Sequence, residues 1–186
     1  MAVNFATFAD LTKRTNALPL HEQRMVKAAA ATWTAAKPKD TFLSHSSKDA
    51  TYLPGVITLL EDHGASVYCD LDDVRMPAKP TPDTAALIKQ EIKKCDRLVI
   101  FITTNSKDSA WVPWELGIGD ASLNPDNVAL LPTAQLAGDQ AWAKQEYLGL
   151  YRHIVWGRLN GESKEIWMVY DYRTNTATKL SQWCRK

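Results

Sequence analysis

From Thr41 onward, short apolar runs alternate with segments of helical periodicity, and this alternation constrains the fold most strongly. The runs have strand length and lie at residues 41–44, 65–70, 97–103, 128–133 and 151–156. The third run, RLVIFIT, lacks polar alternation and is typical of a strand buried on both faces. Strands and helices that alternate at this spacing form parallel sheets through right-handed crossovers. We therefore predict an α/β fold with a five-stranded parallel sheet and helices on both faces.

Local signals predict where the helices begin and end. Ser46 and Asp49 match a capping box, and the helix that they open is expected to stop at Gly64. Thr81 is predicted as the N-cap of the next helix, with a proline at its first position. Pro113 is expected in the first turn of a later helix, because its missing N–H costs nothing there.

The two ends of the chain follow other patterns. Residues 4–36 carry apolar residues at four-residue spacing and are predicted to be helical. The tail EIWMVYDYRTNTATKLSQW alternates apolar and polar residues around a turn-prone RTNT, which predicts an antiparallel hairpin. We accordingly divide the chain into an N-terminal helical extension at 1–38, an α/β domain at 39–157 and a C-terminal β-hairpin extension at 158–186.

Composition argues against several classes of function. The 22 basic and 21 acidic residues nearly cancel, so no electrostatic footprint for nucleic acid or anionic lipid is expected. The longest apolar run is too short to span a bilayer, and the first residues do not form a secretory signal. Three widely spaced cysteines indicate a reducing compartment, and we expect a cytoplasmic protein.

Known cofactor motifs are not found in the sequence. The only glycine pair of interest, GIG at 117–119, lacks the spacing of a phosphate-binding loop. The four histidines are dispersed, with no HExxH or paired CxxC pattern, so no metal site is predicted.

The stretch SAWVPWELGIGD sets one carboxylate, Glu115, among two tryptophans and a proline. Its helix dipole favours a negative charge in the first turn, which makes a structural role for Glu115 the simpler interpretation. However, parallel α/β sheets bind ligands beyond the carboxyl ends of their strands. This helix start is expected at that edge, so Glu115 is also a candidate catalytic carboxylate.

Three segments resemble the signature boxes of Toll/interleukin-1 receptor (TIR) domains in order and spacing. They are DTFLSHSSKD at 40–49, HGASVYCDLDDV at 63–74 and CDRLVIFITTNSKDSAWVPWELG at 95–117. The third is the most specific, because it contains the pattern S-x-W-x-x-x-E-L. The resemblance covers residues 40–157 and implies a flavodoxin-like TIR fold.

Enzymatic members of that family cleave NAD⁺ with the glutamate of the W-x-x-x-E element, which Trp111 and Glu115 match. The resemblance thus implies an NAD⁺ glycohydrolase or cyclase, with NAD⁺ as substrate and no cofactor. Its products would be nicotinamide and ADP-ribose or a cyclic ADP-ribose isomer. Similarity to prokaryotic members implies antiphage signalling, with a separate effector that senses the product and a homo-oligomer built through TIR–TIR contacts.

The same resemblance implies substrate contacts at the strand ends, in the loop after the second strand and on the tryptophan. These residues are Ser44, His45, Asp70, Arg75, Lys79, Thr103 and Trp111. The loop itself, VRMPAKPTPD, has three prolines and no glycine, which makes it stiffer than the family's usual loop.

Two alternatives remain from the sequence. One is a non-catalytic TIR module that works by homotypic assembly. The other is a nucleoside deoxyribosyltransferase-like enzyme, in which a glutamate on a small α/β sheet acts as a covalent nucleophile.

Overall fold

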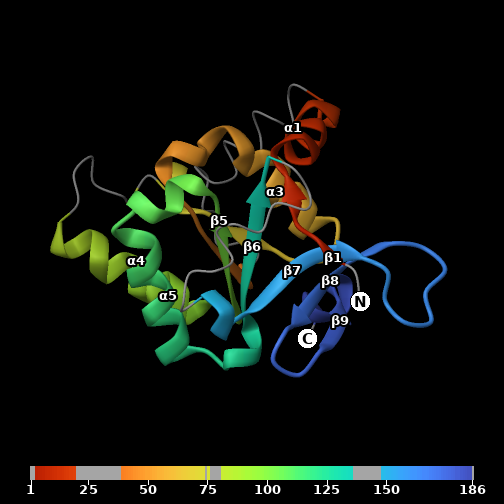
Figure 1. Cartoon of the computed structure of the whole chain (residues 1–186). Coiled ribbons are helices and arrows are strands. Elements are labelled where there is room, and N and C mark those ends of the chain that lie inside the picture. The colour runs from red at the N-terminus through yellow and green to blue at the C-terminus, as the bar shows by residue number, and fades with distance from the viewer. Residues whose placement is uncertain (1–2, 20–38, 74, 76–80, 136–147, 186) are drawn as a thin grey trace.

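A computed structural model describes residues 3–19, 39–73, 75, 81–135 and 148–185 (Figure 1). Five strands of its central sheet are parallel, in the order β4-β3-β5-β6-β7. They are β3 (Thr41–Ser44), β4 (Val67–Tyr68), β5 (Arg97–Ile102), β6 (Val128–Ala134) and β7 (Arg152–Gly157). This is the flavodoxin-like order, so the predicted five-stranded parallel sheet is confirmed.

The predicted C-terminal hairpin is also confirmed. Strand β8 (Ile166–Asp171) pairs antiparallel with β7, and β9 (Thr176–Lys179) pairs antiparallel with β8. Asn175 takes a left-handed conformation in the intervening turn, with a φ of 53°, which asparagine tolerates better than most residues. The hairpin therefore extends the sheet beyond β7, and the short helix α6 (Leu180–Trp183) follows it.

The first residues differ from the prediction. Strand β1 (Val3–Asn4) pairs antiparallel with β7, and β2 (Ala6–Thr7) pairs parallel with β6, where a helix had been expected. Helix α1 (Phe8–Ala17) begins only at Phe8, because Thr7 and Asp10 form a capping box. The rest of the predicted helical stretch, from residue 20 to residue 36, lies outside the described residues.

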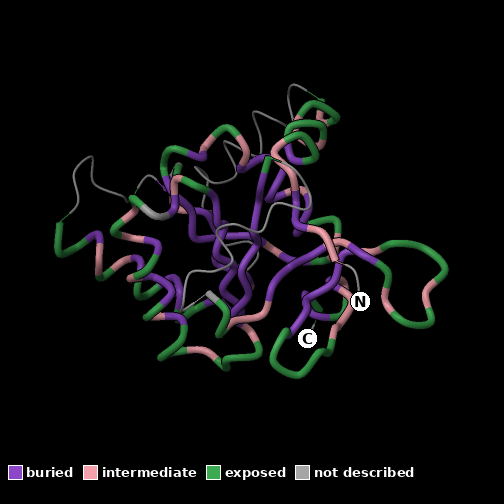
Figure 2. Tube along the Cα trace, in the orientation of Figure 1, coloured by how far each residue is buried: buried purple, intermediate pink, exposed green. Residues whose placement is uncertain are grey.

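Two apolar clusters cover the two faces of the sheet. Along β5, Val99 and Phe101 face a cluster that includes residues of α1, α3 (Leu53–Glu61) and α6. Leu98 and Ile100, which alternate with them, face a cluster shared with α4 (Pro82–Lys94) and α5 (Trp111–Ser122). Figure 2 shows the buried residues concentrated along the central strands. None of the helices in the described part of the chain is long and apolar enough to cross a membrane.

The capping box predicted for Ser46 and Asp49, in the segment after β3, is wrong. Residues Ser47–Tyr52 form the 3₁₀ turn η1, and the α-helix starts only at Leu53. Ser46 makes no side-chain cap, and Asp49 is fully buried in the protein interior. Two other predicted helix ends are confirmed. Gly64 ends the helical region with a φ of 101°, and Thr81 caps α4.

Gly55 allows α1 and α3 to pack closely. A Cβ atom at this position would lie 2.2 Å from the Leu11 carbonyl oxygen, which belongs to backbone and cannot rotate away. We expect Gly55→Ala to lower the free energy of unfolding by about 2–3 kcal/mol, since the helices would have to separate. Urea denaturation would measure this loss.

Gly117→Ala is the matched control for that measurement. Gly117 lies within α5, and a Cβ atom there meets no other atom within 4 Å. The substitution should therefore leave stability unchanged or raise it by up to about 1 kcal/mol. Equal stability of Gly55→Ala and the wild-type protein would contradict the inferred close approach.

Candidate active site

Glu115 and Ser44 meet at the carboxyl edge of the sheet. Ser44 is the last residue of β3, and its hydroxyl donates a short hydrogen bond to Oε2 of Glu115. Both side chains are buried, with Glu115 only 3% exposed. The chain leaves β3 toward β4 on one side and later enters β5 on the other, so this edge is a topological switch point. Such crevices bind ligands in open α/β sheets.

The helix that carries Glu115 starts earlier than predicted. Helix α5 begins at Trp111 rather than near Pro113, and Ser109 accepts a hydrogen bond from the Val112 N–H at its start. Pro113 is tolerated as the third residue because first-turn N–H groups lack helical partners. Glu115 is then the fifth residue of α5, just beyond the first turn. The helix dipole therefore stabilises its charge less than expected.

Burial, together with the nearby charge of Asp70, raises the pKa of Glu115 to about 8, although the Ser44 hydrogen bond acts in the opposite direction. A carboxyl group with such a pKa holds its proton in much of the free protein at neutral pH. A cationic ligand beside it would favour the ionised form. Perturbed carboxyl groups of this kind cluster at functional sites.

Two further predicted residues join the same edge. His45 follows Ser44, and its Nδ1 lies 3.5 Å from a carboxylate oxygen of Asp70, just after β4. The Sγ of Cys69 lies 3.8 Å from the same nitrogen. Burial raises the pKa of Asp70, and His45 opposes that increase. The structure thus brings together Ser44, His45, Asp70 and Glu115 from three different elements.

Thr103 forms a second buried group, centred on Asp49. The Thr103 hydroxyl donates to one Asp49 oxygen at 2.7 Å, and the Asn105 amide donates to the other at 2.6 Å. These bonds join η1 to the turn η3 (Thr104–Asp108), and with it the loop after β3 to the loop after β5. The sequence predicted Asp49 as part of a helix cap and did not indicate that it joins these two loops.

We expect Asp49→Ala to lower the free energy of unfolding by about 1–3 kcal/mol, because it removes the acceptor of the buried Thr103 hydroxyl and of the partly buried Asn105 amide. Asp49→Asn keeps one acceptor oxygen and should cost less. Thermal melting of both variants would measure the difference. A melting temperature of Asp49→Ala equal to that of the wild type would show that the two loops are held by other contacts.

The remaining predicted residues lie in other surroundings. The Arg75 guanidinium contacts the carboxylates of Asp73 and Glu91, so it joins the loop after β4 to α4. Lys79 lies outside the described residues. Trp111 stacks edge-to-face on Trp114 at 5.2 Å, and both rings are partly buried against the same apolar cluster. Trp111, implied by the resemblance as a substrate contact, thus packs in the same surroundings as Trp114.

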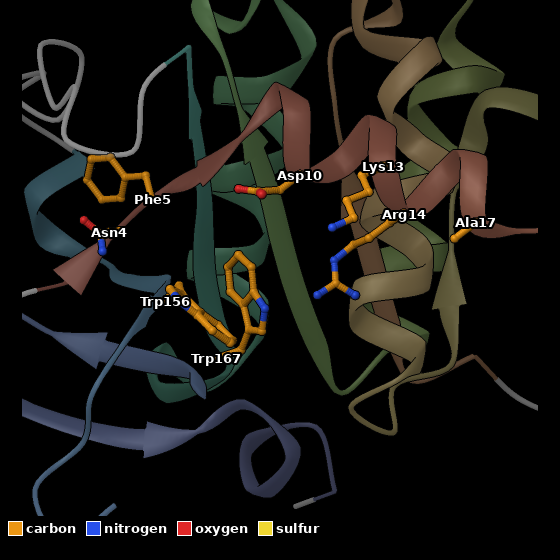
Figure 3. A pocket seen from close by; sticks show the side chains of 8 residues that line it. All are labelled: Asn4, Phe5, Asp10, Lys13, Arg14, Ala17, Trp156 and Trp167. Atoms are coloured by element: carbon orange, nitrogen blue, oxygen red, sulfur yellow. The ribbon is translucent and has the colours of Figure 1, made fainter. Parts of the chain in front are cut away.

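A cavity of about 470 Å³ lies elsewhere, between α1 and strands β7 and β8 (Figure 3). Trp156 and Trp167 form part of its wall, and the cationic ends of Lys13 and Arg14 extend toward them from α1. The Arg14 guanidinium lies 5.9 Å from the Trp167 ring centre. The cavity contains none of the predicted site residues, so it is separate from the Glu115 site.

A flavodoxin-like sheet with a buried carboxylate and serine at its switch point defines an α/β domain with a candidate ligand site at its carboxyl edge. The model of the TIR domain family matches residues 41–166, and the chain belongs to this family. The predicted resemblance is thereby confirmed.

Two relatives carry enzyme names. A protein of Bacillus cereus (strain MSX-D12), named "Probable 3' cyclic ADP-D-ribose synthase ThsB'", is 37% identical over 132 residues. That alignment covers 69% of this chain and 67% of the relative. The "Putative cyclic ADP-D-ribose synthase TIR2" of Cytobacillus dafuensis is 31% identical over 83 residues. Here the alignment covers 43% of this chain but only 22% of the longer relative.

Proposed function

We propose that this protein cleaves the nicotinamide–ribose bond of NAD⁺ and converts the rest of the molecule into a cyclic ADP-ribose isomer. The observation that carries the proposal is the buried Glu115, hydrogen-bonded to Ser44 at the ligand edge of the sheet. The names of the two relatives support the same reaction class. The proposal includes NAD⁺ as a substrate and requires no cofactor.

The chemistry requires little proton transfer at the leaving group. When the bond between nicotinamide and the ribose C1′ breaks, its electron pair moves to the pyridine nitrogen, and nicotinamide leaves as a neutral molecule. The ribose is left with oxocarbenium-like positive charge. A carboxylate next to the ribose stabilises that charge, as in glycoside hydrolysis. Glu115 is assigned this role, and Ser44 positions its carboxylate.

The raised pKa of Glu115 fits a cationic substrate. The positively charged nicotinamide ring of NAD⁺ would favour the ionised carboxylate on binding, and the developing ribose charge would stabilise it further. The carboxylate is therefore ionised when the reaction needs it. His45 and Asp70 are assigned contacts to the dinucleotide at the same edge.

The burial of Glu115 favours cyclisation over hydrolysis. Water that reaches the oxocarbenium carbon gives ADP-ribose, whereas a nucleophilic atom of the same nucleotide gives a cyclic product, and one proton is released in either case. A carboxylate that is only 3% exposed lies in surroundings that exclude water, which favours the intramolecular attack.

The biological part of the proposal follows from the product. A cyclic nucleotide diffuses, so a separate effector protein would detect it as a signal in prokaryotic antiphage defence. The protein itself would act as a homo-oligomer built through TIR–TIR contacts. The name of the Bacillus cereus relative supports the cyclic product from which the signalling role is inferred. The homo-oligomer is inferred from membership of the TIR family.

Incubation of the purified protein with NAD⁺, followed by chromatography and mass spectrometry, tests the reaction. We expect equimolar nicotinamide and a nucleotide lighter than ADP-ribose by one water molecule. ADP-ribose as the sole nucleotide product would support cleavage of NAD⁺ but refute cyclisation. No nicotinamide across a wide range of protein concentrations would refute the proposal.

A further inference from the structure

Three side chains with metal-binding atoms meet where β3 and β4 end. They are the Nδ1 of His45, the Sγ of Cys69 and a carboxylate oxygen of Asp70, and these atoms all lie within 4.8 Å of one another. Two of the separations are 3.8 Å, from sulfur to nitrogen, and 3.5 Å, from nitrogen to oxygen. Adjacent parallel strands thus bring together ligands that lie 24 residues apart in the sequence.

These separations fit a tetrahedral ion. Zinc binds sulfur at about 2.3 Å and nitrogen or oxygen at about 2.0–2.2 Å, so two ligands of one tetrahedral zinc lie roughly 3.5 Å apart. The sulfur–nitrogen and nitrogen–oxygen separations are close to that spacing, and the sulfur–oxygen separation is at most 4.8 Å, so small side-chain movements would place the three atoms at three corners of a tetrahedron. A site with three protein ligands and one open position has the ligand count of catalytic zinc sites rather than structural ones.

The type and charge of the ligands also favour zinc. A thiolate and a carboxylate balance two positive charges, and neutral imidazole completes the set. Thiolate selects zinc-like cations over magnesium and calcium, which prefer oxygen ligands and higher coordination numbers. His45 and Cys69 are buried, with Cys69 only 4% exposed, so an ion there would be largely shielded from water.

We propose that His45, Cys69 and Asp70 bind a thiophilic divalent cation of the zinc class. The absence of a metal motif in the sequence is explained by the topology, because two strand ends supply the ligands. Binding of the ion does not depend on NAD⁺ cleavage. One consequence does rest on the proposed function: an ion that occupies His45 and Asp70 would compete with the dinucleotide and inhibit the reaction.

Titration of the full-length, metal-free protein with Co²⁺ tests the site, with a non-thiol reductant present. We expect a thiolate-to-cobalt charge-transfer band in the near ultraviolet that saturates at one ion per chain and disappears when Zn²⁺ is added. Cys69→Ser should abolish the band and weaken Zn²⁺ binding at least about tenfold in calorimetry. Asp70→Asn should keep the band and weaken binding.

The other two cysteines, Cys95 and Cys184, supply the control. A Cys95→Ser/Cys184→Ser double variant should keep the full band, which assigns it to Cys69 even if Cys69→Ser fails to fold. No charge-transfer band in the wild-type protein at millimolar Co²⁺ would overturn the proposal. So would a band that the folded Cys69→Ser variant retains. Both results are independent of whether the protein cleaves NAD⁺.

Discussion

Glu115→Gln is expected to lower the rate of nicotinamide release from NAD⁺ by about 10²–10³-fold. The amide keeps the shape of the side chain and still accepts the Ser44 hydrogen bond, but it carries no charge to stabilise the ribose cation. Losses of this size accompany the removal of one electrostatic group aimed at a transition state. Initial rates at saturating NAD⁺, followed by chromatography, would measure the effect on kcat.

Controls separate this effect from loss of structure. Glu162→Gln removes a glutamate that pairs with Lys179, far along the chain from the site, and should leave the rate unchanged. Ser44→Ala leaves the carboxylate in place but removes its positioning bond, so we expect a smaller loss, on the order of tenfold. A Glu115→Gln variant that turns over at the wild-type rate would remove Glu115 from the reaction.

The second large effect concerns stability and pH. Burial and the charge of Asp70 raise the pKa of Glu115 to about 8, above its ordinary value of 4.5. The folded protein then keeps a proton that the unfolded chain releases. The resulting stability is complete below pH 4.5 and is lost as the pH rises toward 8. One pKa unit corresponds to about 1.4 kcal/mol, so the loss is on the order of 5 kcal/mol.

Glu115→Gln should remove this dependence. We expect the variant to be more stable than the wild-type protein at pH 8–9, with the two converging near pH 5. Urea denaturation at several pH values would measure the difference. Asp70 and its partner His45 remain in both proteins, so the comparison isolates Glu115. Parallel pH profiles of the two proteins would show that Glu115 ionises as an ordinary surface carboxylate.

The two expected effects of Glu115→Gln, on activity and on stability, have opposite directions. A residue selected for stability would cost stability when it is replaced. We instead expect that Glu115 lowers the free energy of unfolding of the wild-type protein, and that its replacement lowers the rate of the reaction. This opposition is typical of a group that is kept for catalysis.

The sequence predicted the central sheet well, because its signals are local. The run at β5 is apolar throughout, and alternation with helices implied parallel strands before any pairing was known. Helix ends were predicted where one residue type determines the conformation, as at Gly64 and Thr81. The edge that carries Ser44 and Glu115 followed from the rule for ligand sites in such sheets.

Contacts between residues that are far apart in the chain could not be predicted from the sequence. Residues 3–7 form strands only because β6 and β7 offer them partners more than 120 residues away. Asp49 lies in a sequence typical of a helix cap, but two donors from the loop after β5 satisfy it better in the interior. Cys69 meets His45 only through the pairing of β3 with β4.

The most direct test of the account is nicotinamide release by the wild-type protein and Glu115→Gln, measured in parallel on folded samples at the same concentration. We predict that the wild type releases nicotinamide with one equivalent of a cyclic nucleotide, while the variant releases less than about 1% as much in the same time. Equal release by the two proteins, or none by the wild type under any condition tested, would contradict it.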